Sequence, residues 1–195
     1  RAARGETVTS NTGQPFQLIR PLDFLVLTDH AEARGLAPMV RDSNPVLLSS
    51  KRGREVWEAF NAGGEQAMKA FGGLLADVSA GVNPFADIDM AGSVWPEFVQ
   101  LAETYNQPGV FTAMTGFEWT SQPNGNNLHR IVVFADGADK TSLVQPFSMF
   151  DSQDPAKLWD YMERYEASTG GRVFAHVHNG NLSNGIAFTT ATFDG

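Results

Sequence analysis

The sequence contains no cysteine, and its acidic residues outnumber its basic ones. The 195 residues include 22 Asp and Glu against 14 Lys and Arg, which gives a formal net charge of -8. The absence of cysteine excludes disulfides, cysteine-ligated zinc and a cysteine nucleophile. The acidic balance argues against a nucleic-acid partner, because binding a phosphate backbone requires a basic face. A small anionic substrate fits this charge if cations such as metal ions supply local positive potential.

Several sequence motifs are absent as well. There is no run of about 18 apolar residues, so we expect no membrane span. Glycine-rich nucleotide loops, a Gly-x-Ser-x-Gly elbow and a His-Glu-x-x-His helix are missing, so nucleotide-binding folds, serine hydrolases and zinc proteases of these types gain no support. The chain begins at Arg1 without a signal peptide, and we expect a piece of a longer protein. A periplasmic, secreted or cytoplasmic location stays open, as does the oligomeric state.

Hydrophobic periodicity predicts alternating strands and helices within one domain, and the 42% apolar content is enough for a sizeable core. We expect strands at 22–28, 110–117, 129–134 and 172–178, and helices at 52–78, 93–105 and 155–169. The near-continuous apolar run at 22–28 is typical of a parallel strand buried on both faces. The order of elements favours an α/β fold with a largely parallel sheet, part of a barrel.

Capping and turn residues define the ends of the predicted helices. Gly63-Gly64 is expected to break the first helix, Ser93 to cap the second and Asp154 to cap the third. Apolar residues at three-to-four spacing predict the buried faces: Val56, Trp57, Phe60, Ala67, Met68, Phe71 and Leu75, then Val94, Phe98, Leu101, Ala102 and Tyr105, then Leu158, Trp159, Met162 and Tyr165. The polar segments 1–15 and 179–195 are expected to be irregular.

The four histidines are the candidate metal ligands. They are His30, His129, His176 and His178, each at or near the end of a predicted strand, and Glu118 follows another strand. Several imidazoles and a carboxylate from different strand ends are the ligands that a divalent metal ion needs. Because the carboxyl ends of parallel strands face the site in α/β folds, this pattern favours a metal-dependent hydrolase.

Each candidate also has a purely structural interpretation. Asp29 could cap a helix that has His30 in its first turn, instead of flanking a metal ligand. His129 could be a hydrogen-bonded histidine at a sheet edge, and Arg130 beside it should point to the opposite face. Glu118 lies between two aromatic residues and could point to water, whereas a buried carboxylate there would need a partner or a metal.

His176 and His178 are separated by one residue. If both lie in the strand, they project to the same face and could share one metal or serve two. Alternatively, one is buried against a backbone partner and the other is exposed. The following Asn179-Gly180-Asn181 favours a functional role, because it permits a sharp turn that places backbone N–H groups near an anion.

These residues lie in segments that resemble the PHP (polymerase and histidinol phosphatase) superfamily. Residues 22–32, which include Thr28-Asp29-His30, resemble its second motif. More closely, the chain resembles an uncharacterised bacterial family within it, a domain of unknown function. The supporting segments are 20–24, 116–121, 127–130 and 178–185, so the likeness runs from about residue 10 to 188.

The resemblance implies a distorted seven-stranded β/α barrel with two or three zinc, manganese or iron ions at the strand ends. It implies phosphoester hydrolysis by metal-activated water. His30, Glu118, His129 and His178 match metal ligands, with Glu118 as the bridging carboxylate. Asp29 matches an acid that orients a ligand or faces the substrate, so Asp29 and Glu118 are the candidate catalytic acids. Candidates for contacts to an anionic substrate are Arg130, His176, Asn179 and Asn181.

Two departures from the superfamily pattern concern the ends of the chain. No His-x-His pair precedes His30, and no Asp-x-His pair follows His178. We therefore expect the middle of one PHP-like domain, truncated at both ends, with coil at 1–15, barrel core at 16–188 and the start of a further part at 189–195. The predicted function is a metal-dependent phosphoesterase. The alternatives are an amidohydrolase-like enzyme that cleaves another ester or amide, and a degenerate barrel without catalysis.

Overall fold

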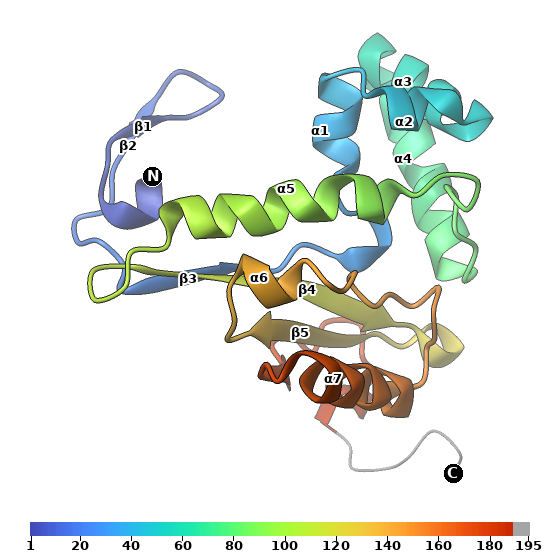
Figure 1. Ribbon diagram of the computed structural model, residues 1–195. Coiled ribbons are helices and arrows are strands. Elements are labelled where there is room, and N and C mark those ends of the chain that lie inside the picture. Colours follow the sequence, from blue (N-terminus) through green and yellow to red (C-terminus); the bar gives the residue numbers. More distant parts are fainter. Residues whose placement is uncertain (189–195) are drawn as a thin grey trace.

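The computed structural model describes residues 1–188 and has a mixed α/β fold (Figure 1). The strands are β1 (Val8–Thr9), β2 (Pro15–Phe16), β3 (Phe24–Leu27), β4 (Thr112–Ser121), β5 (Leu128–Phe134) and β6 (Val173–Val177). The α-helices are α1 (Leu36–Arg41), α2 (Pro45–Ser49), α3 (Lys51–Ala62), α4 (Gly64–Ser79), α5 (Met90–Tyr105), α6 (Ala138–Thr141) and α7 (Pro155–Thr169). The 3-10 helices of the described residues are η1 (Ala2–Arg4), η2 (Ala31–Ala33), η3 (Pro123–Gly125) and η4 (Ile186–Phe188).

Four strands form the main sheet, in the order β3-β4-β5-β6. β3 and β4 are parallel, whereas β4 with β5 and β5 with β6 are antiparallel. The predicted α/β class is confirmed, but the prediction of a largely parallel sheet is wrong for the described chain. A short polar turn at 122–127 joins β4 to β5, and strands joined by so short a connection pair antiparallel. The parallel strands β3 and β4 are instead joined by a long helical crossover. The sheet is open across residues 1–188 and does not close into a barrel.

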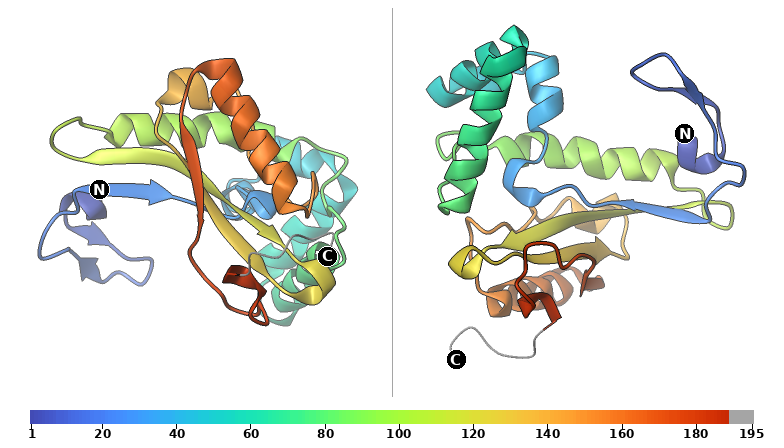
Figure 2. Two further views of the ribbon diagram at one scale, coloured as in Figure 1. Left: turned by 90° about the horizontal axis from the view of Figure 1, so that it is seen from below. Right: turned by 180° about the vertical axis from the view of Figure 1, so that it is seen from behind.

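Helices α5 and α7 pack on the same face of the main sheet (Figure 2). The buried core on this face is formed by Trp95 and Val99 from α5, Leu158 and Tyr165 from α7, and Phe117, Trp119, Val132 and Phe134 from the strands. Side chains alternate along a strand, so the residues between these strand positions point to the opposite face. That opposite face carries Glu118, Thr120 and His129.

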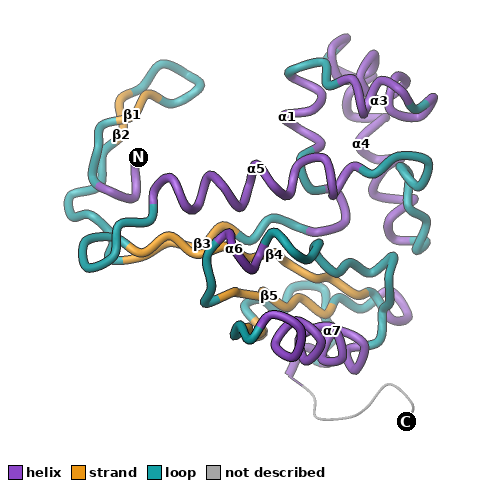
Figure 3. Tube along the Cα trace, viewed as in Figure 1, coloured by secondary structure: helices purple, strands orange, loops and turns teal. Residues whose placement is uncertain are grey.

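Helices α1 to α4 form a separate group beyond one end of the sheet (Figure 3). Their side chains, among them Leu47 and Val56, build a second buried cluster together with Phe85 of the following loop and Met90 of α5. The predicted break within 52–78 is confirmed, because Gly63 has φ 70° and separates α3 from α4. This helical group lies between β3 and β4 in the sequence and forms most of the crossover that makes those two strands parallel.

The predicted caps are confirmed only in part. The Asp154 side chain caps α7, as expected. Helix α5 begins earlier than predicted, at Met90, because the Asp89 carboxylate accepts a hydrogen bond from the first turn. Ser93 is therefore not the cap, and its hydroxyl donates to the Met90 carbonyl.

Some residues predicted to be buried are exposed, namely Met68, Phe71, Leu75, Leu101 and Trp159. In α4 the neighbouring Leu74 enters the core instead, so periodicity predicts the helix but places its buried side about one residue away. In β3, Phe24 is 61% exposed and Leu27 is also exposed. The expected burial of this strand on both faces is wrong for residues 1–188, where β3 is an edge strand paired only with β4.

Short elements escape prediction because they are too brief to show periodicity. Helices α1, α2 and α6 have four to six residues each, and the segment 1–15 holds η1 and most of the β1–β2 hairpin instead of coil alone. The predicted segment 189–195 lies outside the described residues, and the division into one truncated domain stays a prediction. Within residues 1–188 no helix has the length and apolarity that crossing a bilayer requires.

Candidate metal centre

The backbone brings His30 and Glu118 together. His30 follows the end of β3 and pairs with Glu118 of β4 in an isolated parallel bridge, in which the Glu118 N–H donates to the Asp29 carbonyl at 3.0 Å. In the β4–β5 pair, Thr120 lies opposite His129. Because residues two apart on a strand share a face, Glu118, Thr120 and His129 all lie on the face opposite α5 and α7. Three separate segments therefore deliver side chains to one place.

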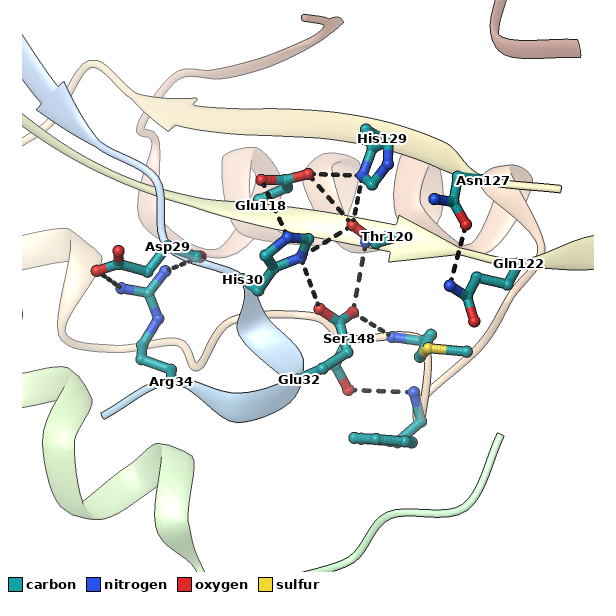
Figure 4. Close-up of polar contacts among 12 residues, drawn as sticks. Asp29, His30, Glu32, Arg34, Glu118, Thr120, Gln122, Asn127, His129 and Ser148 are labelled. Carbon is teal, nitrogen blue, oxygen red and sulfur yellow. Dashed lines mark hydrogen bonds and ion pairs between the residues drawn. The ribbon is translucent and has the colours of Figure 1, made fainter. Parts of the chain in front are cut away.

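Three of the predicted ligands form a close group (Figure 4). His129 Nδ1 lies 2.7 Å from Glu118 Oε1, and His30 Nε2 lies 3.7 Å from Glu118 Oε2. His30, Glu118 and His129 each offer one ligand atom, and these atoms all lie within 4.8 Å of one another. The prediction that these imidazoles and this carboxylate meet in space agrees with this geometry. The group is a candidate metal site.

His178 lies at the border of this group. Its Nε2 is 3.7 Å from Glu118 Oε1, and its ring centroid is 6.0 Å from that of His129. It follows the last residue of β6, and its side chain is 30% exposed. The fourth predicted ligand is thus adjacent to the three, on the solvent side.

Two further residues that had no predicted role contact the group. The Thr120 hydroxyl lies 3.1 Å from His30 Nδ1 and 3.0 Å from His129 Nδ1, and it donates to Glu118 Oε1 at 3.3 Å. The carboxylate of Glu32 lies with its Oε2 3.5 Å from His30 Nδ1. Glu32 stands two residues after His30, in the same quoted segment, but position alone does not indicate that η2 turns its side chain back toward the sheet.

The surroundings of the two histidines shift their proton affinities in opposite directions. The neighbouring Glu32 carboxylate raises the pKa of His30, burial opposes this shift, and the charges of Glu118 and Asp29 add to it. Burial lowers the pKa of His129, although Glu118 acts in the other direction. Neutral imidazole is the form that binds a metal, so the lowered pKa of His129 favours the form that can act as a ligand.

The donor set fits a divalent cation. Glu118 and Glu32 are both buried, and among residues 1–188 no lysine or arginine forms an ion pair with either carboxylate. His129 Nε2 and Glu32 Oε2 are buried and have no hydrogen-bond partner in the described structure. A buried carboxylate without a cation is costly, and a metal ion held by His30, Glu118 and His129 would remove that cost for Glu118. Imidazole nitrogen and carboxylate oxygen serve zinc, manganese and iron alike.

The side chains of Asp29 and Arg130 do not face the group of His30, Glu118 and His129, although each residue is next to a predicted ligand in the sequence. The Asp29 side chain is largely exposed and lies 4.0 Å from Arg34 Nη1 instead of facing the histidines (Figure 4). The Arg130 guanidinium donates to the backbone carbonyls of His129 and Ala187, at 3.2 Å and 3.1 Å. The expectation that Arg130 and its neighbour take opposite faces agrees with the strand register. The catalytic and substrate-binding roles assigned to these residues stay predictions.

His176 and the asparagines also lie apart from the close group. His176 is paired with Ile131 in the strand register, and its ring stacks on Phe174 with a centroid distance of 6.3 Å. The Asn179 side chain accepts a hydrogen bond from the Asn181 N–H at 2.8 Å, which stabilises the turn after β6. Both asparagines are exposed, and their contacts with a substrate stay predictions.

Buried Arg34 ties together the backbone on which the group is built. Its Nη2 donates to the carbonyls of Asp29 and Gly116, at 2.6 Å and 3.3 Å, and its guanidinium lies over the rings of Phe98 and Trp95. Burial lowers the pKa of Arg34 to about 10, so it stays a cation at neutral pH. Arg34 links the end of β3 to β4, a role for which the sequence offered no signal.

A cleft of about 570 Å³ borders His30. Its lining includes Asp29, His30 and Arg34 together with Phe98 and Leu101 of α5. Of the candidate ligands, His30 lines this cleft, whereas Glu118, His129 and His178 do not.

Comparison with known proteins gives a family but no activity. The family model described as "Protein of unknown function (DUF3604)" matches residues 1–195. No curated protein and no solved structure matches the chain. Because the match covers the whole sequence, this chain belongs to the DUF3604 family.

Proposed function

We propose that this protein is a divalent-metal-dependent hydrolase that acts on a small anionic ester, with a phosphoester as the first choice. The observation that carries the proposal is the convergence of His30, Glu118 and His129 from three chain segments around a buried carboxylate. His178 lies close enough to join them after a small movement. One or more metal ions held there would polarise the substrate and make water a better nucleophile.

The chain's own residues would then hold and orient the reactants. His30, Glu118, His129 and His178 provide nitrogen and oxygen ligands, and Thr120 contacts three of these side chains through one hydroxyl. The cleft beside His30 offers a place for the organic part of a substrate, with apolar contacts from α5. Asp29, at the wall of the cleft, is placed to interact with a substrate hydroxyl or a water molecule.

The preference for phosphoesters rests on the resemblance to the PHP superfamily. The segment Thr28-Asp29-His30 and the positions of Glu118, His129 and His178 support it. We further propose that the sheet is part of a PHP-type barrel. In support, α5 and α7 share one face of the sheet while the candidate ligands lie on the other, as barrel strands separate outer helices from an inner face. The two antiparallel strand pairs are a departure from a regular parallel barrel.

The test is a hydrolysis assay with the protein encoded by the complete gene, loaded separately with zinc, manganese and ferrous ions. The substrates are aryl phosphate, aryl sulfate, carboxylic ester and amide probes. We expect phosphate hydrolysis that chelators abolish and that His30→Ala and Glu118→Ala reduce strongly, while His176→Gln has no such effect. Hydrolysis of only the carboxylic ester or amide would favour the amidohydrolase alternative. Metal binding without any hydrolysis would indicate a degenerate barrel.

A further inference from the structure

The side chain of Glu32 is held in one orientation by the backbone around it. Glu32 Oε1 accepts hydrogen bonds from the Thr120 N–H at 3.4 Å and the Met149 N–H at 3.1 Å. The carboxylate is buried, with a side-chain exposure of 4%. Its second oxygen, Oε2, has no hydrogen-bond partner in the described chain and faces His30 Nδ1 at 3.5 Å. One end of the carboxylate is therefore fixed, and the other is aimed at the imidazole.

We propose that Glu32 is a positioning residue for His30, which selects the imidazole tautomer that carries its proton on Nδ1. A carboxylate oxygen can only accept a hydrogen bond, so the nitrogen facing it is favoured as N–H. The other nitrogen, Nε2, then keeps a free lone pair on the side of Glu118 Oε2, 3.7 Å away. This inference rests on the proposed metal centre, since it assigns Nε2 as the atom through which His30 would bind a metal.

Thr120 is compatible with the same tautomer. Its hydroxyl lies 3.1 Å from His30 Nδ1, where either atom can be the donor, and 3.3 Å from Glu118 Oε1, which only accepts. When the hydroxyl donates to the Glu118 carboxylate, it presents lone pairs to the imidazole, so it accepts from the Nδ1–H that Glu32 selects.

The substitution Glu32→Gln separates positioning from folding. The two backbone N–H groups of Thr120 and Met149 require an acceptor, so the amide oxygen of glutamine should take the place of Oε1. The amide NH₂ must then face His30 Nδ1. In the reversed orientation the NH₂ would face the two backbone N–H groups, and two donors form no hydrogen bond with each other. Glutamine thus keeps the backbone contacts and presents a donor to the imidazole, which favours the tautomer with the proton on Nε2.

The experiment measures the His30 tautomer by long-range ¹H–¹⁵N NMR in the metal-free protein, at a pH where a titration followed by the same signals shows that the imidazole has lost its second proton. We expect Nδ1–H in the wild type and Nε2–H in Glu32→Gln. Zinc and manganese affinities, measured by calorimetry, should fall about 10- to 100-fold in Glu32→Gln. Exposed Glu58 of α3 supplies the matched control, and Glu58→Gln should change neither the tautomer nor the affinity.

The two readouts distinguish this inference from the metal proposal. The same His30 tautomer in wild type and Glu32→Gln, with both proteins folded by circular dichroism, overturns the positioning role. A tautomer switch without metal binding in any variant keeps the positioning role and refutes the metal centre. A second variant, Thr120→Val, serves if Glu32→Gln does not fold. It removes the Thr120 hydroxyl and keeps Glu32, so His30 should keep the wild-type tautomer. A reversed tautomer in Thr120→Val would overturn the assignment to Glu32.

Discussion

His30 and Glu118 are neighbours through their backbones, not only through their side chains. They face each other in an isolated parallel bridge, and the Glu118 N–H donates to the carbonyl of Asp29, directly before His30. Arg34 reinforces this junction from the other side through the carbonyls of Asp29 and Gly116. The relative position of the imidazole and the carboxylate is therefore a property of the fold, which is the preorganisation that a metal centre needs.

The first prediction concerns the aromatic core behind the site. Phe117 is fully buried between α5, α7 and the sheet, so Phe117→Ala should lower the free energy of unfolding by about 3–5 kcal/mol. The matched control is Phe174, an exposed phenylalanine on β6, whose replacement by alanine should cost less than about 1 kcal/mol. Urea denaturation followed by tryptophan fluorescence measures both. Equal losses in the two variants would contradict the described core.

The second prediction concerns the close approach of strands at Gly116. A Cβ there would lie 2.6 Å from the Val132 carbonyl oxygen, so the backbone would have to shift. Gly116→Ala should therefore destabilise the protein by about 1–3 kcal/mol. Gly72 in α4 has open space around it, and Gly72→Ala should instead stabilise by up to about 1 kcal/mol, because alanine favours helix. Thermal unfolding of both variants checks the opposite signs.

The third prediction concerns pH in the metal-free protein. The folded-state pKa of His30 is raised above its unfolded value of about 6.5, so protonated His30 stabilises the fold. This contribution is complete below the unfolded pKa and is lost as pH rises through the raised folded-state pKa. His30→Gln should accordingly lower the melting temperature more at about pH 5.5 than at about pH 8.5.

Glu32 is the main cause of that raised pKa, which supplies the control. In a Glu32→Gln background, the effect of His30→Gln should lose most of its pH dependence, as in a double-mutant cycle for two interacting residues. A pH dependence of unchanged size in that background would show that Glu32 is not the source.

The fourth prediction separates the two histidines at the end of β6. His178 lies 3.7 Å from Glu118, whereas His176 stacks on Phe174 outside the group. His178→Gln should weaken zinc affinity by at least about tenfold, since a ligand contributes a few kcal/mol and 1.4 kcal/mol is tenfold. His176→Gln should leave the affinity unchanged. A larger loss for His176→Gln than for His178→Gln would place the metal elsewhere on this face.

Much of the local structure follows from the sequence. The apolar run at 22–28 predicts a strand just before His30, Gly63 predicts a helix break, and Asp154 predicts a helix start. These signals are local, because a run of apolar residues, a left-handed glycine and a capping carboxylate act within a few residues. The same reasoning placed candidate ligands at strand ends, and the structure brings three of them together.

The parts that escaped prediction depend on distant contacts. The direction of β5 and β6 follows from how the strands pair, and Glu118 lies inside β4 instead of at its end. Glu32 owes its role to the Thr120 and Met149 backbone, 88 and 117 residues away in the chain. No local pattern encodes such partners, so sequence reasoning could name the ligands but not the residues that orient them.

The most direct test of the metal centre is the zinc and manganese affinity of Glu118→Gln, measured by calorimetry on protein stripped of metal. Glutamine preserves the shape of Glu118 but removes the charge that joins His30, His129 and His178. We predict a loss of at least about 100-fold, because one ligand of four accounts for a few kcal/mol of binding, with Glu58→Gln binding as the wild type does. Wild-type stoichiometry and affinity in Glu118→Gln would contradict the account.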